Sequence, residues 1–130
     1  MPRVIHFQIS TDKPEELAEF YEKVFGWKIR KLEGPVENWL IITGEESEPG
    51  IDGGIVRRTK QEHEQSVLLI VDVSSVDEFS KKVAENRGTI VDSKRALPGI
   101  GWLVLFKGPE GTMSGMLERD ESLGMRKHTL

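Results

Sequence analysis

The feature that most constrains the fold of this chain is an internal repeat at a spacing of 62 residues. The repeat matches hydrophobic residues, helix ends and turn glycines, and it contains few long identities. It pairs His6 with Leu68, Ile9 with Val71, Leu17 with Phe79, Tyr21 with Val83, Gly26 with Gly88 and Gly53 with Gly115. A fixed period of this kind indicates a repeated supersecondary unit. Chance similarity is the alternative, and we prefer duplication because the order of the elements also repeats.

Both copies have the same expected order of elements. In the first copy a strand at 4–9 is followed by a helix that ends at Gly26 and by strands at 27–32, 38–43 and 53–58. In the second copy a strand at 67–71 is followed by a helix that ends at Gly88 and by strands at 89–92, 102–106 and 113–118. The segments 12–15 and 75–78 predict a capping box at the start of each helix. We therefore predict an α+β fold of two tandem βαβββ modules, whose curved mixed sheets form a shared cleft with the helices on the outer faces.

The length of 130 residues is typical of one domain. We expect a single domain over residues 1–120, made of module 1 at about 3–58, a polar connector at 59–65 and module 2 at about 66–119, with a C-terminal tail at 121–130. The chain has no cysteine, which excludes disulfides and thiolate chemistry. Its net charge of −4 gives no reason to expect nucleic acid or a membrane surface as a partner. Without a signal-peptide pattern, we expect a cytoplasmic location.

Side-chain alternation predicts which strand residues face the cleft. In the first strand, Phe7 and Ile9 share one face while His6 and Gln8 share the other. In the third strands, Trp39 and Trp102 occupy matching positions 63 residues apart, and alternation alone leaves both orientations open. The two rings would either form aromatic walls for a flat ligand or pack in the core.

Some charged and aromatic residues have a simpler interpretation. Arg57, Arg58 and Lys60 form a short basic cluster, which we interpret as a solvated strand end rather than a site for an acidic partner. Phe20 and Tyr21 lie on the apolar stripe of the first helix, so we expect them in the core.

Five segments of the chain carry a resemblance to a known family: residues 4–9, 20–27, 50–55, 99–102 and 108–111. Together they resemble the vicinal oxygen chelate superfamily, which includes glyoxalase I, bleomycin-resistance proteins and extradiol dioxygenases. The resemblance covers about residues 4–118 and implies the two-module fold and a homodimer. It leaves the reaction open, because the family contains isomerases, lyases, oxygenases and non-catalytic drug binders.

The resemblance also implies four positions for metal ligands, two in each module. His6 matches the first of them, whereas the others fall at Gly53 or Gly54, at Leu68 and at Gly115. A catalytic zinc usually has about three protein ligands. We therefore predict no cofactor and no complete metal site. His6 remains the best candidate for a catalytic residue.

These observations predict a glyoxalase/bleomycin-resistance-like protein that binds a small organic molecule in the cleft between the modules. The residues expected to line that cleft are His6, Gln8, Trp39, Gly53, Gly54, Leu68, Trp102 and Gly115. One alternative is a glyoxalase-like lyase or isomerase, or a dioxygenase, that uses a divalent metal bound by His6 and further ligands. The second alternative is a non-catalytic interaction scaffold.

Overall fold

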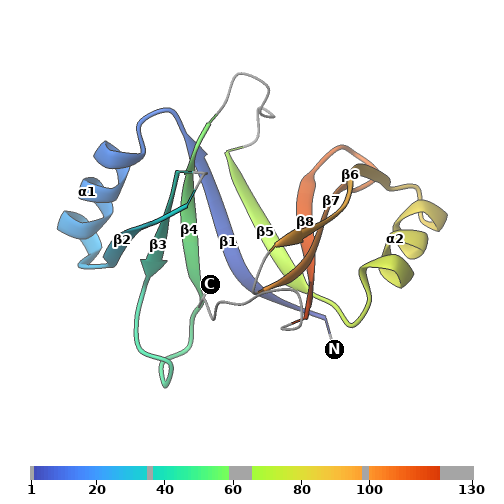
Figure 1. Ribbon diagram of the computed structural model, residues 1–130, viewed down its shortest axis with the longest axis horizontal. Helices are drawn as coiled ribbons and strands as arrows, with labels where there is room; N and C mark the ends of the chain where they lie inside the picture. The colour runs from blue at the N-terminus through green and yellow to red at the C-terminus, as the bar shows by residue number, and fades with distance from the viewer. Residues whose placement is uncertain (1, 35–36, 59–65, 98–99, 121–130) are drawn as a thin grey trace. The chain divides into compact units, whose positions relative to one another are not determined.

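The computed structural model describes residues 2–34, 37–58, 66–97 and 100–120 (Figure 1). Two βαβββ modules follow one another along the chain, which confirms the predicted α+β class and order of elements. The first module contains β1 (Arg3–Thr11), α1 (Pro14–Phe25), β2 (Lys28–Leu32), β3 (Asn38–Ile42) and β4 (Asp52–Arg57). The second contains β5 (Val67–Asp72), α2 (Val76–Glu85), β6 (Thr89–Leu97), β7 (Gly101–Lys107) and β8 (Met113–Arg119).

The chain divides into two compact units whose boundaries differ slightly from the ends of the strands. The divisions fall between Ile5 and His6 and between Leu68 and Leu69. The first residues of β1, including Val4, therefore belong to the unit that contains α2. Among the described residues, neither helix has the length and apolar character needed to cross a membrane.

The sheet of the first module has the strand order β2-β3-β4-β1, with β1 parallel to β4 and the other pairs antiparallel. Phe7 and Ile9 of β1 face α1, as alternation predicts. The core on this side contains the buried residues Ile9, Ala18, Trp39, Ile41 and Ile55, against which Phe7, Leu17, Tyr21, Trp27 and Ile29 pack. Only part of the apolar stripe of α1 is buried in this core. Phe20 is 54% exposed, so our assignment of this residue to the core is wrong.

The sheet of the second module repeats this arrangement with the order β5-β8-β7-β6 and a parallel β5–β8 pair. The core beneath α2 contains the buried residues Val73, Val76, Val104 and Met116, against which Val71, Phe79, Val83, Ile90, Trp102 and Phe106 pack. Each module therefore has one sheet face covered by its own helix and one face directed away from it.

The start of α2 is capped as predicted. Ser75 is the N-cap residue, and its hydroxyl oxygen accepts a hydrogen bond from the backbone N–H of Glu78 at 3.1 Å. The carboxylate of Glu118 in β8 accepts a second hydrogen bond from the N–H of Val76 at 3.0 Å. Acceptors at these N–H groups are favourable because the first turn of a helix has no internal partners for them.

The start of α1 differs from the predicted capping box. The helix begins at Pro14, so Lys13 rather than Asp12 occupies the N-cap position and no side chain caps the helix there. Thr11 instead accepts a hydrogen bond from the N–H of Lys13 through its hydroxyl at 3.1 Å. Gly26 ends α1 in the left-handed conformation at φ 73°, as predicted.

The end of α2 also differs from the prediction. The helix stops at Glu85 with Asn86 as C-cap, and Arg87 adopts the positive φ of 70°. Gly88 serves a different purpose, because a Cβ atom there would stand 2.6 Å from Val83 and 2.9 Å from the carbonyl oxygen of Lys107. Its lack of a side chain permits a close approach of backbone rather than a turn.

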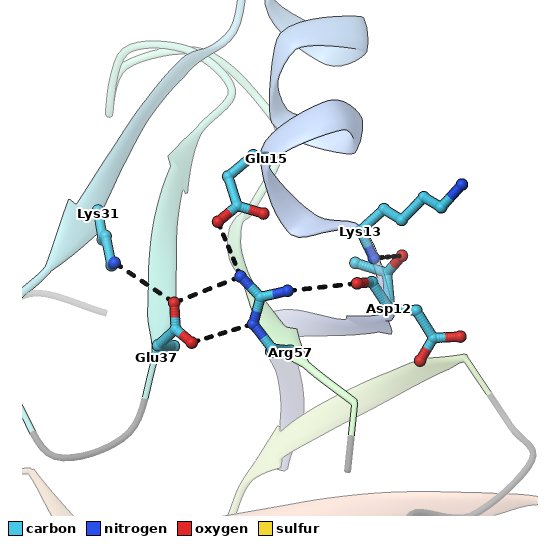
Figure 2. A network of polar contacts seen from close by, with 7 residues as sticks. Asp12, Lys13, Glu15, Lys31, Glu37 and Arg57 are labelled. Carbon is cyan, nitrogen blue, oxygen red and sulfur yellow. Dashed lines mark hydrogen bonds and ion pairs between the residues drawn. The ribbon is translucent and has the colours of Figure 1, made fainter. Parts of the chain in front are cut away.

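Arg57 connects three parts of the first module (Figure 2). Its guanidinium donates hydrogen bonds to Glu15 at 2.7 Å, to Glu37 at 3.0 Å and to the carbonyl oxygen of Asp12 at 3.3 Å. Hydrogen bonds from Arg57 and then from Lys31 lower the pKa of Glu37 below its ordinary value. Arg57 thus joins the end of β4 to the start of α1 and to the residue before β3.

The neighbouring arginine is also used within the module. Arg58 donates hydrogen bonds from Nη2 to the carbonyl oxygen of Ser10 at 2.8 Å and to the hydroxyl of Ser66 at 2.9 Å. Lys60, the third residue of the predicted basic cluster, lies outside the described residues. The two arginines therefore contribute to the structure of the module more than a solvated strand end would.

Candidate functional site

The face of the first module directed away from α1 carries the candidate site. Strand β1 pairs His6 with Asp52 and Gln8 with Gly54 in β4, and β3 pairs Leu40 with Gly54. Paired residues of neighbouring strands point to the same face of a sheet. Because Phe7 and Ile9 face the core, these five residues share the opposite face.

His6 is the central titratable group of this face. The side chain is half-buried, and this burial lowers the pKa of His6 from its ordinary value of 6.5, while the negative charge of Asp52 partly opposes the shift. The imidazole is therefore neutral at pH 7. A neutral imidazole has one nitrogen that donates and one that accepts a hydrogen bond, so it can bind a hydroxyl, a carbonyl or a carboxylic acid.

Asp52 is a residue of this face that the sequence analysis did not select. Its Oδ1 accepts a hydrogen bond from the backbone N–H of Thr43 at 2.9 Å. The Thr43 hydroxyl donates its single proton to the carbonyl oxygen of Ile51 at 2.7 Å and lies 3.3 Å from Oδ1 of Asp52. Asp52 is thus held in a fixed position beside His6. Its position two residues before Gly54 gives it the same alternation, and this signal was available in the sequence.

The structure separates the two glycines that the sequence left as alternatives. A Cβ atom at Gly54 would stand 3.6 Å from Nε2 of His6 and 3.2 Å from the carbonyl oxygen of Trp39. A Cβ atom at Gly53 would stand 2.5 Å from the ring of Phe7, on the face covered by α1. Gly54 therefore permits the close approach of the His6 imidazole on one face, whereas Gly53 permits that of the Phe7 ring on the other.

Both tryptophans lie on the faces covered by helices. Trp39 is 6% exposed within the core beneath α1, and Trp102 packs against the core beneath α2. Lys31 and Lys94 lie over these rings, with Nζ 5.4 Å and 4.8 Å from the respective centroids. The structure thus shows the core-packing alternative, and it does not bring Trp39 together with His6.

The corresponding positions of the second module have apolar surroundings. Gly115 of β8 pairs with Ile70 of β5, and a Cβ atom there would stand 2.8 Å from Ile70 and 3.2 Å from Leu105. Leu68 is 6% exposed. The face of this module directed away from α2 is therefore packed with aliphatic side chains at these positions.

The residues at the four family ligand positions do not fit a metal ion. Only His6 offers a donor atom, since Gly54, Leu68 and Gly115 have none, and Asp52 adds a single carboxylate. In the described part of the chain, no group of three or more His, Asp or Glu side chains is placed to hold a metal.

The comparison with protein families agrees with this architecture. Residues 3–113 match the model of the Glyoxalase/Bleomycin resistance protein/Dioxygenase superfamily. The match spans most of the 130 residues. The chain belongs to this superfamily. A search of curated proteins gave no match.

Solved structures with the same fold include several proteins of low sequence identity. A hypothetical protein from Bacillus halodurans is 15% identical with a TM-score of 0.69, and the alignment covers 92% of this chain and 96% of that one. Methylmalonyl-CoA epimerase from Mycobacterium tuberculosis is 13% identical with a TM-score of 0.66, covering 92% and 89%. A Streptomyces coelicolor methylmalonyl-CoA epimerase variant, solved with 2-nitronate-propionyl-CoA, is 13% identical with a TM-score of 0.65, covering 88% and 92%. At these identities the similarity establishes the fold alone.

Proposed function

We propose that this protein binds a small oxygenated organic molecule on the face of the first module around His6, and that it does so without the metal of the family. The observation that carries the proposal is the close approach of the half-buried imidazole to β4, where a Cβ atom at Gly54 would stand 3.6 Å from Nε2 of His6. The homodimer and the cytoplasmic location expected from the sequence stay predictions, as does the cleft between the modules.

The residues around His6 suit a ligand with both polar and apolar parts. His6 and Gln8 supply hydrogen-bond donors and acceptors, and the Gln8 amide matches a carbonyl oxygen. Leu40, which is 4% exposed, is a buried apolar residue paired with Gly54 on this face. A few polar groups that converge on an apolar surface are typical of small-molecule sites.

The ligands of the similar structures support this class of molecule. One methylmalonyl-CoA epimerase structure holds methylmalonyl-CoA and NH4+, and another holds 2-nitronate-propionyl-CoA. Both organic ligands combine acyl and charged oxygen groups. We therefore choose an acylated and carboxylated compound as the first probe, and we extend no reaction to this chain.

The proposal is tested by thermal unfolding with methylmalonyl-CoA and with free methylmalonate, each measured in EDTA and again with zinc. A ligand at one hundred times its Kd stabilises the folded state by about 2.7 kcal/mol. We expect stabilisation in EDTA that is lost in His6→Ala and reduced in Gly54→Val. Gly108→Ala is the matched control, because a Cβ atom there meets only the carbonyl oxygen of Thr112, at 3.9 Å.

Two outcomes would overturn the proposal. Stabilisation that requires zinc would favour the metal-dependent enzyme. Stabilisation by neither probe, or equal stabilisation of the wild type and His6→Ala, would remove the assignment of this face as the site.

A further inference from the structure

The two modules fill the space beneath their helices differently. Beneath α1, the rings of Tyr21 and Trp27 lie 4.9 Å apart between centroids and pack against the core. The 62-residue repeat places Val83 and Thr89 at the equivalent positions of the second module. Val83 is thus a smaller side chain at the position of Tyr21, whereas Thr89 is exposed and is not among the residues that pack beneath α2.

A pocket lies beneath α2, beside the smaller side chain. Its volume is about 240 Å³, and its walls are the apolar side chains of Val71, Val73, Phe79, Val83, Phe106 and Met116. The exposed residues Pro2 and Lys82 complete the lining. Phe79 and Val83 come from α2, and the strand residues belong to the core that α2 covers. The pocket is therefore separate from the sheet face that carries Gly115.

The charged side chains around this pocket differ in whether they have a partner. A second pocket of about 330 Å³ shares Pro2, Val73 and Phe79 with the first, and its charged side chains already have partners. Arg119 donates to Asp72 at 2.7 Å, and Glu118 accepts from the N–H of Val76. Lys82 has no ion pair among the described side chains, and its Nζ lies 4.6 Å from the centroid of the Phe79 ring. An unpaired ammonium thus stands beside an apolar pocket.

We propose that this pocket binds a short aliphatic carboxylate, with the chain among the apolar side chains and the carboxylate beside Lys82. The apolar walls favour a hydrocarbon chain because they remove it from water. The positive charge selects an anionic head group over a neutral or cationic one. Small-molecule pockets usually measure roughly 300–1,000 Å³, so the volume of about 240 Å³ limits the ligand to a short chain.

Octanoate is the probe, and 1-octanol is the matched compound without the charge. Binding is followed by the methyl resonances of Val83 and Met116, with the methyl group of Ile55 in the first module as an internal reference. We expect saturable shifts at Val83 and Met116 and none at Ile55. Shifts that are absent, that do not saturate, or that are as large at Ile55 would overturn the proposal.

Variants separate the head group from the chain. Lys82→Met should weaken octanoate binding roughly two- to fivefold, as expected for one exposed charge pair, and should leave 1-octanol unchanged. Lys81→Met is the matched control because Lys81 is the exposed neighbour that does not line the pocket. Val83→Phe should abolish the binding of both compounds. Equal effects of the two lysine variants would overturn the assignment of Lys82, and unchanged binding in Val83→Phe would overturn the pocket.

Further controls distinguish other occupants of the pocket. His6→Ala should leave octanoate binding unchanged, so a loss of binding there would place octanoate at the site proposed above instead. Shifts at Val83 that follow protein concentration rather than octanoate would show that a second copy of the chain covers the pocket, and the proposal would fail. If Val83→Phe does not fold, the methyl shifts of the wild type decide the question.

Discussion

The adjacent glycines of β4 offer a direct test of the two faces of the first module. In Gly53→Ala the new Cβ atom would stand 2.5 Å from the Phe7 ring, inside a packed core. Overpacking of this kind costs about 1–3 kcal/mol, and the lower entropy of the unfolded chain returns about 0.4–1 kcal/mol. We therefore expect a net loss of about 1–2 kcal/mol in the free energy of unfolding.

Gly54→Ala should behave differently, because its nearest atoms would be 3.2 Å and 3.6 Å away. The entropic gain there offsets most of the strain, so we expect a change within about 0.5 kcal/mol. Urea denaturation followed by circular dichroism measures both variants. The double variant Gly53→Ala with Phe7→Leu should be more stable than the sum of the single changes by at least about 0.5 kcal/mol, because the smaller side chain makes room for the methyl group. Equal losses in the two alanine variants, or strict additivity in the double variant, would refute the assignment of the faces.

Three further predictions concern His6, Asp52 and the cap of α2. Burial lowers the pKa of His6 below 6.5 in the folded protein, so the unfolded chain binds the proton at a higher pH. The contribution of His6 to the free energy of unfolding is therefore present above pH 6.5 and is lost as the pH falls through the pKa of the folded state. Asp52→Asn should lower the pKa of His6 further, which an NMR titration of the imidazole measures; a rise in pKa would contradict the electrostatic role of Asp52. Ser75→Ala should destabilise the protein by about 1 kcal/mol because it removes the acceptor for the Glu78 N–H. Ser74→Ala, at the exposed neighbour, should change little in the same thermal melt, and equal effects of the two variants would contradict the cap.

The order of elements was predictable because it depends on local signals that repeat. Alternating strands, the stop at Gly26 and the cap at Ser75 are each set by residues close in sequence. The predicted cap of α1 was wrong because Asp12 fits the capping pattern, but the helix begins one residue later than that pattern requires. An error of one residue is enough to move an N-cap oxygen out of reach of the N–H groups.

The orientation of the site residues depended on pairing between strands, which a single strand does not reveal. Alternation in β3 allowed either Trp39 or Leu40 to face the core. The register of β3 with β4 pairs Trp39 with Ile55 and Leu40 with Gly54, and this pairing decides the question. The same register separates Gly53 from Gly54. Asp52 could have been found by extending the alternation of Gly54 back by two residues.

The two modules differ in the side chains on both faces of their sheets. The face away from the helix keeps His6, Gln8 and Asp52 in the first module, whereas the second module has Ile70 and Leu105 around Gly115. Introducing a carboxylate at Gly115 would place its charge among these aliphatic side chains, which carries a large desolvation cost. A single substitution would therefore not recreate a metal ligand at this position, because the surrounding residues have changed with it.

The faces beneath the helices show the reverse asymmetry. Tyr21 and Trp27 pack beneath α1 in the first module, while Val83 is one wall of a pocket beneath α2 in the second. We therefore propose the polar face of the first module and the apolar pocket of the second as two independent sites in one repeated framework. Because they lie in different modules, substitutions at His6 and at Val83 should affect separate ligands.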